Sequence, residues 1–211
     1  MEQEKESLQQ TNETNSDTKE STKTVLSYLH DLVCLIAAVM LIFSFCLRVV
    51  VVSGPSMKNT LYNGDCLLVL GRIFYPNPKN GDIVVISKDS FEDGTPIIKR
   101  VIATEGQTVD IDFENGLVYV GTGDDLTVIE EPYILAPTYY RDRLNSMDFP
   151  VTVPEGCVFV MGDNRNESMD SRNTIIGFVD KREILGKAIF LFFPGSDIGR
   201  RDFSRIGVLA H

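Results

Sequence analysis

The chain of 211 residues contains only two histidines, His30 and His211. His30 borders an apolar segment, and His211 is the last residue of the sequence. A catalytic serine of the Ser-His-Asp type needs a buried and oriented imidazole as its general base. Because neither histidine is placed to supply one, a nucleophilic serine in this chain must use another base.

Cysteine is also scarce. The four cysteines are Cys34, Cys46, Cys66 and Cys157, and no two of them have the C-x-x-C spacing that is typical of a zinc site. Cys66 and Cys157 lie in apolar, strand-like runs, and the sequence leaves open whether they form a disulfide. We therefore expect no metal site and no cofactor.

Positive charge is in deficit: 20 Lys and Arg stand against 30 Asp and Glu, which gives a net charge of -10. Without a basic stripe to displace counterions from phosphates, nucleic acid is not an expected partner. Residues 105–131 carry eight acidic residues and no Lys or Arg. They lack the regular oxygen spacing of a calcium loop, so we interpret them as a solvated face.

The sequence predicts that the N-terminal part is a polar tail followed by a membrane anchor. Residues 1–24 are polar and almost free of apolar side chains, which predicts a disordered cytoplasmic tail. Residues 32–47 carry no formal charge, and with their flanks they predict a transmembrane helix over residues 25–48. The alternative is a buried core helix, but this run is apolar on every face rather than along one stripe. The positions of Lys and Arg slightly favour a cytoplasmic N-terminus.

Residues 49–211 read as a mainly β domain, a sandwich or barrel of short strands, which the anchor would hold outside the cytoplasm. Apolar or β-branched runs alternate there with turns rich in Gly, Pro, Asn and Asp. The strongest hairpin signal is Asn115-Gly116. The expected strands cover residues 66–70, 83–87, 97–104, 108–111, 117–120, 157–161 and 188–193.

Three stretches carry residues that suit chemistry. Ser56 follows a Ser-Gly-Pro turn, where a serine often only caps its own backbone. Lys99 and Arg100 fall within an apolar run, and we expect one of the two to point into an apolar environment. Burial would lower the pKa of a lysine and make it a base, unless the residue lies on an edge strand with its amine in water. The third stretch, residues 162–172, contains acidic residues and arginines that could hold a loop together by ion pairs. A solvent-exposed loop can have the same composition.

Together these stretches resemble the type I signal peptidases, membrane-bound serine proteases of the Ser-Lys kind. Four segments carry the resemblance, which extends from about Phe43 to the C-terminus, and their order matches that of the family motifs. They are Ser56-Met57 with Thr60-Leu61, Gly81-Asp82-Ile83-Val84, Lys99-Arg100-Val101, and Gly162-Asp163-Asn164-Arg165 with Ser168, Asp170, Ser171 and Arg172.

The resemblance implies that Ser56 is the nucleophile and Lys99 the general base. It also implies that Ser168 hydrogen-bonds and orients the lysine, that the Ser56 backbone N–H binds the oxyanion, and that further charges brace the site. The bracing residues are Asp163, Arg165, Asp170 and Arg172. The implied substrates are secretory preproteins with small residues before the cut, and the implied setting is the lipid bilayer of the cell membrane, crossed once.

Two departures from the family pattern stand beside the nucleophile. Asn59 replaces the usual proline, which predicts a less rigid turn. Gly54 occupies a position where some members have a serine that donates to the oxyanion. These two residues favour the alternative reading, a membrane-tethered β domain that binds a partner or an inactive paralogue. A soluble self-cleaving Ser-Lys regulator is disfavoured by the apolar segment, and a histidine-based signal peptidase by the lack of a usable histidine.

Overall fold

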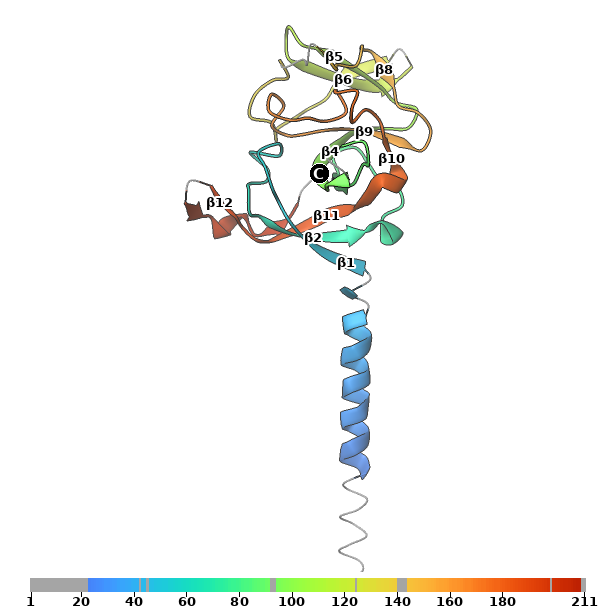
Figure 1. The fold of residues 1–211 in the computed structure, drawn as a ribbon, viewed down its shortest axis with the longest axis vertical. Coiled ribbons are helices and arrows are strands. Elements are labelled where there is room, and N and C mark those ends of the chain that lie inside the picture. The colour runs from blue at the N-terminus through green and yellow to red at the C-terminus, as the bar shows by residue number, and fades with distance from the viewer. Residues whose placement is uncertain are drawn as a thin grey trace, which may run out of the picture. The chain divides into compact units, whose positions relative to one another are not determined.

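The computed structural model describes residues 23–41, 43–44, 46–91, 94–123, 125–139, 144–197 and 199–209 (Figure 1). The chain divides into two compact units, Met1–Phe45 and Cys46–His211. Most of the expected tail, residues 1–22, and His211 lie outside the described residues.

The first unit contains a helix of 19 residues, Lys23–Leu41, with a mean hydropathy of 1.9 over its most apolar stretch. Among the described residues it is the one helix that is long and apolar enough to cross a membrane. It starts two residues before the expected boundary. Leu47 and Arg48, which we expected at its end, instead belong to strand β1, Leu47–Val51. The valines that follow Arg48 favour extended structure, and pairing with β2 carries the strand back to Leu47.

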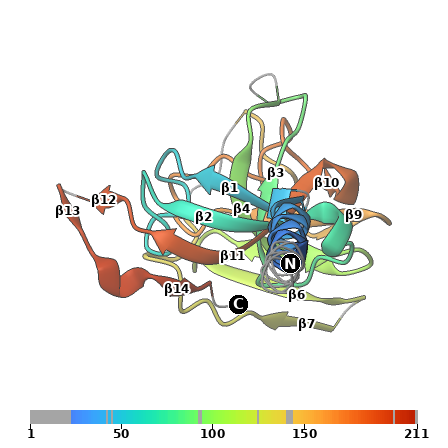
Figure 2. The same ribbon diagram turned by 90° about the horizontal axis from the view of Figure 1, so that it is seen from below.

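The second unit is mainly β, as the sequence predicts, and its largest sheet is antiparallel throughout. Figure 2 shows β1, β2 and β11 side by side. The strand order is β1, β2 (Cys66–Gly71), β11 (Ile184–Phe193), β3 (Ile83–Ile86), β4 (Ile97–Thr104), β9 (Cys157–Met161) and β10 (Val179–Asp180), with β14 (Gly207–Val208) also pairing with β11.

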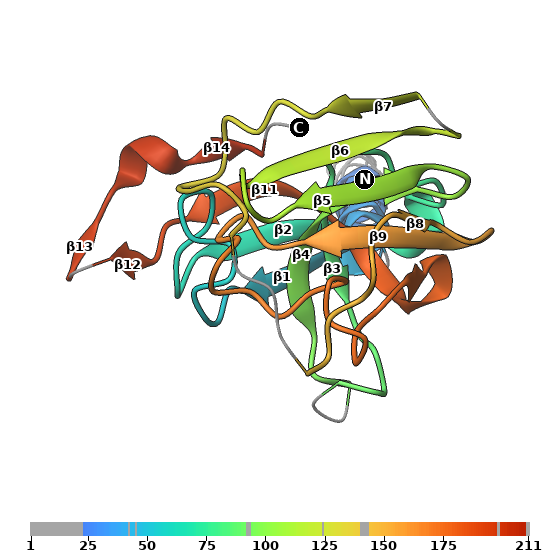
Figure 3. The same ribbon diagram turned by 90° about the horizontal axis from the view of Figure 1, so that it is seen from above.

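A smaller sheet lies over the large one and is seen from above in Figure 3. It has the order β7 (Asp125–Val128), β6 (Leu117–Thr122), β5 (Thr108–Asp112) and β8 (Val151–Thr152). The predicted hairpin at Asn115-Gly116 is confirmed, and the positive φ of 74° at Gly116 explains the glycine. The remaining short elements are η1 (Arg72–Phe74), η3 (Lys181–Glu183), η4 (Phe203–Arg205) and the pair β12 (Ser196–Asp197) and β13 (Arg200–Arg201).

All seven expected strands form. β4 and β9 have the predicted bounds, whereas β11 starts at Ile184, four residues before the expected start of its run. Several short strands, β7, β8 and β10 among them, have no counterpart among the predictions because they are only two to four residues long. All four cysteines are free, so Cys66 and Cys157 do not form a disulfide in this structure.

Strand β4 lies in the middle of the hydrophobic core. One cluster of buried side chains includes its Ile98, a second fills the space between the two sheets and includes Ile102, and a third includes Val101. Ile98 and Val101 are three residues apart and so point to opposite faces of the strand. Both faces of β4 are therefore covered, and this decides the environment of the two charged residues between them.

Candidate active site

Ser56 belongs to a tight turn over residues 55–61, which we call the nucleophile turn. Met57 and Leu61 of this turn are fully buried in the first hydrophobic cluster. The Leu61 N–H donates to the Met57 carbonyl over 2.8 Å. The turn is thus anchored by two apolar side chains while Ser56 stays partly exposed.

The amine of Lys99 reaches this turn from β4. Its Nζ lies 2.8 Å from Ser56 Oγ, and the side chain is only 3% exposed. Burial lowers the pKa of Lys99 from 10.5 to about 8; Arg172 lowers it too, while Asp170 and Asp163 oppose the shift. A large share of this amine is therefore neutral near pH 8, and a neutral amine at this distance can accept the hydroxyl proton.

We expected only one of the two charged residues of β4 to be drawn inward, and this is wrong. Arg100 is 2% exposed and Lys99 3%, because both faces of the strand are covered. The Arg100 Nε and Nη2 donate to the two Asp163 oxygens over 2.8 and 2.7 Å, and Nη1 donates to the Gly81 carbonyl over 2.7 Å. Thr60 Oγ1 donates to the same Asp163 carboxylate over 2.5 Å. Asp163 thereby joins β4, which we call the base strand, to the nucleophile turn.

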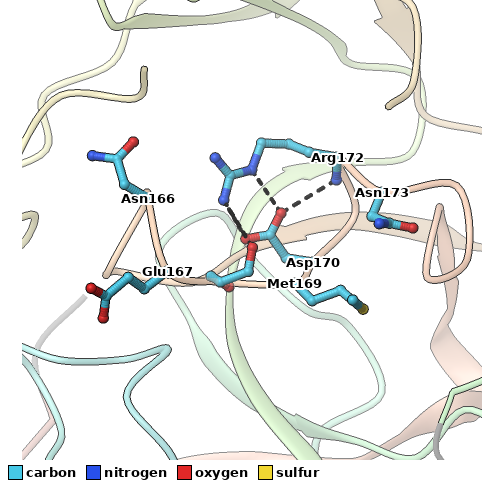
Figure 4. A pocket seen from close by; sticks show the side chains of 7 residues that line it. Asn166, Glu167, Met169, Asp170, Arg172 and Asn173 are labelled. Carbon is cyan, nitrogen blue, oxygen red and sulfur yellow. Dashed lines mark hydrogen bonds and ion pairs between the residues drawn. The ribbon is translucent and has the colours of Figure 1, made fainter. Parts of the chain in front are cut away.

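A second ion pair holds the loop of residues 162–172. The Arg172 Nε and Nη2 each lie 2.8 Å from an Asp170 oxygen, and the Gly162 N–H donates to Asp170 over 2.9 Å. Burial alone would raise the pKa of Asp170, but Arg172 outweighs it and holds this pKa below its usual value. Figure 4 shows the pair from close by. The two residues line a pocket of about 330 Å³. The cavity is lined by Asn166, Glu167, Ser168, Met169, Asp170, Arg172 and Asn173.

The expected hydrogen bond from Ser168 to Lys99 is not formed. Ser168 Oγ is buried and, within the described part of the chain, has no hydrogen-bond partner. It lies instead against Gly162, where a Cβ would come within 2.3 Å of this oxygen and 2.4 Å of the Ser56 carbonyl oxygen. Ser168 is thus close to the nucleophile turn, and a side chain at position 162 would clash with both.

Arg165 is almost fully buried, with 1% of its surface exposed. Its Nε donates to the Gly162 carbonyl over 3.0 Å, its Nη1 lies 3.4 Å from Thr138 Oγ1, and its Nη2 forms an ion pair with Glu131. Our interpretation of residues 105–131 as a solvated face is therefore wrong at Glu131, whose side chain is 6% exposed. A buried arginine requires a carboxylate, and its partner cannot be read from a run of acids.

Residues 129–139, which we call the strap, contact both β4 and the 162–172 loop. Tyr133 of the strap lies with its ring 3.9 Å below the guanidinium carbon of Arg100. Neither Glu131 nor Tyr133 is among the site residues that the sequence predicts. The only signal available was a tyrosine at the end of an acidic run, and such a pattern is common on surfaces.

The two departures beside the nucleophile take defined conformations. Both Gly54 and Asn59 have φ near 91°, and the Asn59 side-chain amide donates to the Tyr133 carbonyl over 2.9 Å. This hydrogen bond restrains the turn at Asn59, whereas the sequence predicts that Asn59 makes the turn less rigid. The Gly54 N–H donates to Asn63 Oδ1 over 3.2 Å, whereas the Ser56 N–H has no acceptor among the described residues.

An open cleft of about 150 Å³ contains both Ser56 and Lys99. One side is formed by Val50, Val51 and Ser53 at the end of β1, and the other by residues 95–98 at the start of β4. The described residues contain no group of three His, Cys, Asp or Glu side chains that could hold a metal ion. A hydroxyl, a buried amine with a lowered pKa and an adjacent cleft define a candidate site of a serine hydrolase with a lysine base.

Comparison with known proteins shows that the chain is similar to peptidases. The family model for signal peptidase, peptidase S26, matches residues 25–193. Signal peptidase I of Bacillus licheniformis is 34% identical over 84% of this chain and 94% of its own length. The probable signal peptidase I-1 of a Synechocystis species is 41% identical over 71% of this chain and 72% of its own. A solved signal peptidase I from Enterococcus faecalis is 29% identical, covering 53% of this chain and 96% of its own, with a TM-score of 0.40. The chain belongs to the peptidase S26 family of signal peptidases.

Proposed function

We propose that this protein is a signal peptidase that cleaves N-terminal signal peptides from secretory preproteins, with Ser56 as nucleophile and Lys99 as general base. One observation carries the assignment of roles: the Lys99 Nζ lies 2.8 Å from Ser56 Oγ, and the lysine is almost fully buried. In water a lysine amine is protonated at neutral pH, so it acts as a base for a serine only where its surroundings lower its pKa, and burial is the main cause here.

In the proposed reaction, neutral Lys99 accepts the Ser56 hydroxyl proton as Oγ attacks the scissile carbonyl carbon. The negative charge on the carbonyl oxygen is stabilised by the unengaged Ser56 N–H. The Lys99 ammonium then gives its proton to the leaving amine, and an acyl-enzyme remains. Water, deprotonated by Lys99, releases the acyl group and restores the hydroxyl of Ser56.

The cleft supports an extended substrate. The end of β1 and the start of β4 leave room for a peptide strand between them, and backbone pairing is a common way to hold such a segment. Apolar side chains of the cleft, Val50, Val51 and Ile98 among them, would contact the residues before the cut, which we propose are small.

The apolar helix supports a position in the membrane. Lys23–Leu41 is long enough to cross the bilayer once, and only five residues separate its end from Leu47 of β1. We propose that the N-terminus is cytoplasmic and that the β unit lies outside the cytoplasm. Such an anchor would keep the active site near signal peptides that are themselves in the bilayer, which raises their effective concentration.

The test is cleavage of one preprotein by the full chain in detergent, with N-terminal sequencing of the product. Ser56→Ala is expected to lower the rate by at least about 10³-fold, as loss of a nucleophile does in other serine proteases. Ser90→Ala is the matched control, because its hydroxyl is exposed and, among the described residues, bonds only the Ile175 carbonyl. No cleavage by the unmodified chain would favour the binding protein instead, and normal cleavage by Ser56→Ala would refute the nucleophile.

A further inference from the structure

The strap touches all three segments of the candidate site, although it belongs to none of the motifs. It is fixed to the small sheet at both ends, by the Ile129 N–H to the Val118 carbonyl and by the Thr138 N–H to the Gly116 carbonyl, each over 3.0 Å. Between these ends, Tyr133 makes three different contacts toward the site. The strap is therefore a held segment rather than a loose connection.

The ring and hydroxyl of Tyr133 face the two buried arginines. Its ring centre lies 3.9 Å from the Arg100 guanidinium carbon, well within the range of a cation–π contact. Its hydroxyl donates over 3.2 Å to Glu131, which forms the ion pair with Arg165. The Tyr133 side chain thus contacts Arg100, which follows Lys99 in β4. It also contacts Glu131, the ion-pair partner of Arg165 in the 162–172 loop.

The carbonyl of Tyr133 holds the nucleophile turn through Asn59. The Thr60 N–H donates to the Met57 carbonyl over 3.1 Å, so Asn59 is the third residue of a four-residue turn. Asn59 is the only non-glycine residue with positive φ among those described, and asparagine tolerates this left-handed conformation better than most residues. Proline is locked near -65°, so this chain uses a turn that proline cannot adopt. A hydrogen bond of 2.9 Å to Tyr133 takes over the restraint.

We propose that Tyr133 is a positioning residue for the reaction, which fixes the nucleophile turn, the base strand and the 162–172 loop relative to one another through its carbonyl, ring and hydroxyl. This inference rests on the proposed function of Ser56 and Lys99. It assigns to the strap the task of keeping Ser56 Oγ within reach of the Lys99 amine. A displacement of about 1 Å between reacting groups can lower a rate by about 10²-fold.

The first test compares two replacements of Tyr133 in the full chain. Tyr133→Phe keeps the ring over Arg100, and we expect kcat within about 3-fold of the unmodified protein, because one hydrogen bond of a side chain is worth little. Tyr133→Leu keeps an apolar side chain but removes the ring face, and we expect kcat to fall by about 10- to 100-fold with KM changed less than about 3-fold. Tyr139→Leu, the other strap tyrosine, is the control, because its side chain is 54% exposed and makes none of these contacts.

The second test uses Asn59→Gly, which keeps the positive φ and removes only the donor to Tyr133. We expect kcat to fall by about 10-fold at a temperature far below the unfolding midpoint, with the midpoint lowered by less than about 4 °C. A purely structural role would leave kcat unchanged there, since nearly every molecule stays folded. The pH midpoint of kcat should also stay in place, because the surroundings of Lys99 are unaltered.

Normal kcat for both Tyr133→Leu and Asn59→Gly would overturn the proposal. A loss of kcat in Tyr133→Phe as large as that in Tyr133→Leu would overturn the role assigned to the ring. A shifted pH midpoint in Asn59→Gly would also overturn the proposal, since the residue would then act on the base. These outcomes are distinct from failure of the proposed function. That failure would appear as absence of cleavage by the unmodified chain.

Discussion

Replacing Lys99 by methionine separates the two consequences of burying a lysine. Methionine has a similar length and is apolar, so it can occupy the same space without a proton to lose or gain. Lys99→Met should abolish cleavage, because no other amine lies within reach of Ser56 Oγ among the described contacts. The same change should stabilise the fold at neutral pH, because it removes a charge that burial disfavours.

The size of this stabilisation follows from the pKa. A fall from 10.5 to about 8 corresponds to about 3 kcal/mol, since one pH unit is worth about 1.4 kcal/mol. Between pH 8 and 10.5 the unfolded chain holds the proton and the folded chain does not, so the stability of the unmodified protein rises with pH across this window. Below pH 8 both states are protonated and the full cost is present. Lys99→Met should therefore be more stable by up to about 3 kcal/mol at pH 7, and by much less at pH 10.5.

The assay is denaturant unfolding of both proteins in detergent at pH 7 and pH 10, together with kcat/KM of the unmodified protein from pH 6 to 10. Its rate should rise about tenfold per unit below pH 8 and level off above it, because only the neutral amine accepts a proton. The reasoning is refuted if Lys99→Met is the less stable protein at pH 7. It is equally refuted if the rate is flat across this range, or if Lys99→Met still cleaves.

Two further substitutions probe the packing around the dyad. Asp163→Asn leaves the buried Arg100 without a counter-charge, and removing one partner of such a pair costs about 3–5 kcal/mol; equilibrium unfolding measures it, and a loss below about 1 kcal/mol would contradict the pairing. Gly162→Ala places a methyl group 2.3 Å from Ser168 Oγ and 2.4 Å from the Ser56 carbonyl oxygen. We expect it to lower kcat and destabilise the fold by about 1–3 kcal/mol, and unchanged kinetics would show that the nucleophile turn does not rest against Gly162.

Much of the β unit follows from local sequence. Runs such as those of β4 and β9 combine β-branched residues with flanking Gly, Asn and Asp, so both their existence and their bounds are predictable. The end of the apolar helix is not predictable in this way. Leu47 and Arg48 fit a helix as well as a strand, and only pairing with β2 across many residues decides for the strand.

The residues of the site also divide into those that the sequence predicts and those that it does not. Ser56, Lys99 and the 162–172 loop stand in recognisable motifs, and the structure brings them together. Glu131 and Tyr133 have no such motif. Their partners, Arg165 and Arg100, are more than thirty residues away along the chain, and an acidic residue near other acids gives no sign of burial. Only the fold shows that the strap lies against two buried guanidinium groups.

The alternation of side chains along a strand does not explain why lysine is residue 99 and arginine is residue 100. The chemistry of the two side chains does. In a strand covered on one face only, one of two adjacent charges would reach water. In β4 both are buried, and the two side chains differ in how they tolerate it. An arginine stays charged at any physiological pH, so Arg100 must have a carboxylate, and Asp163 provides a bidentate one. A lysine can lose its proton instead. Within the described part of the chain Lys99 has no carboxylate within hydrogen-bond distance, only the Ser56 hydroxyl, and burial lowers its pKa. An arginine at position 99 would place a group that cannot be neutralised beside the nucleophile, so K99R should remain inactive at every pH at which the protein is folded.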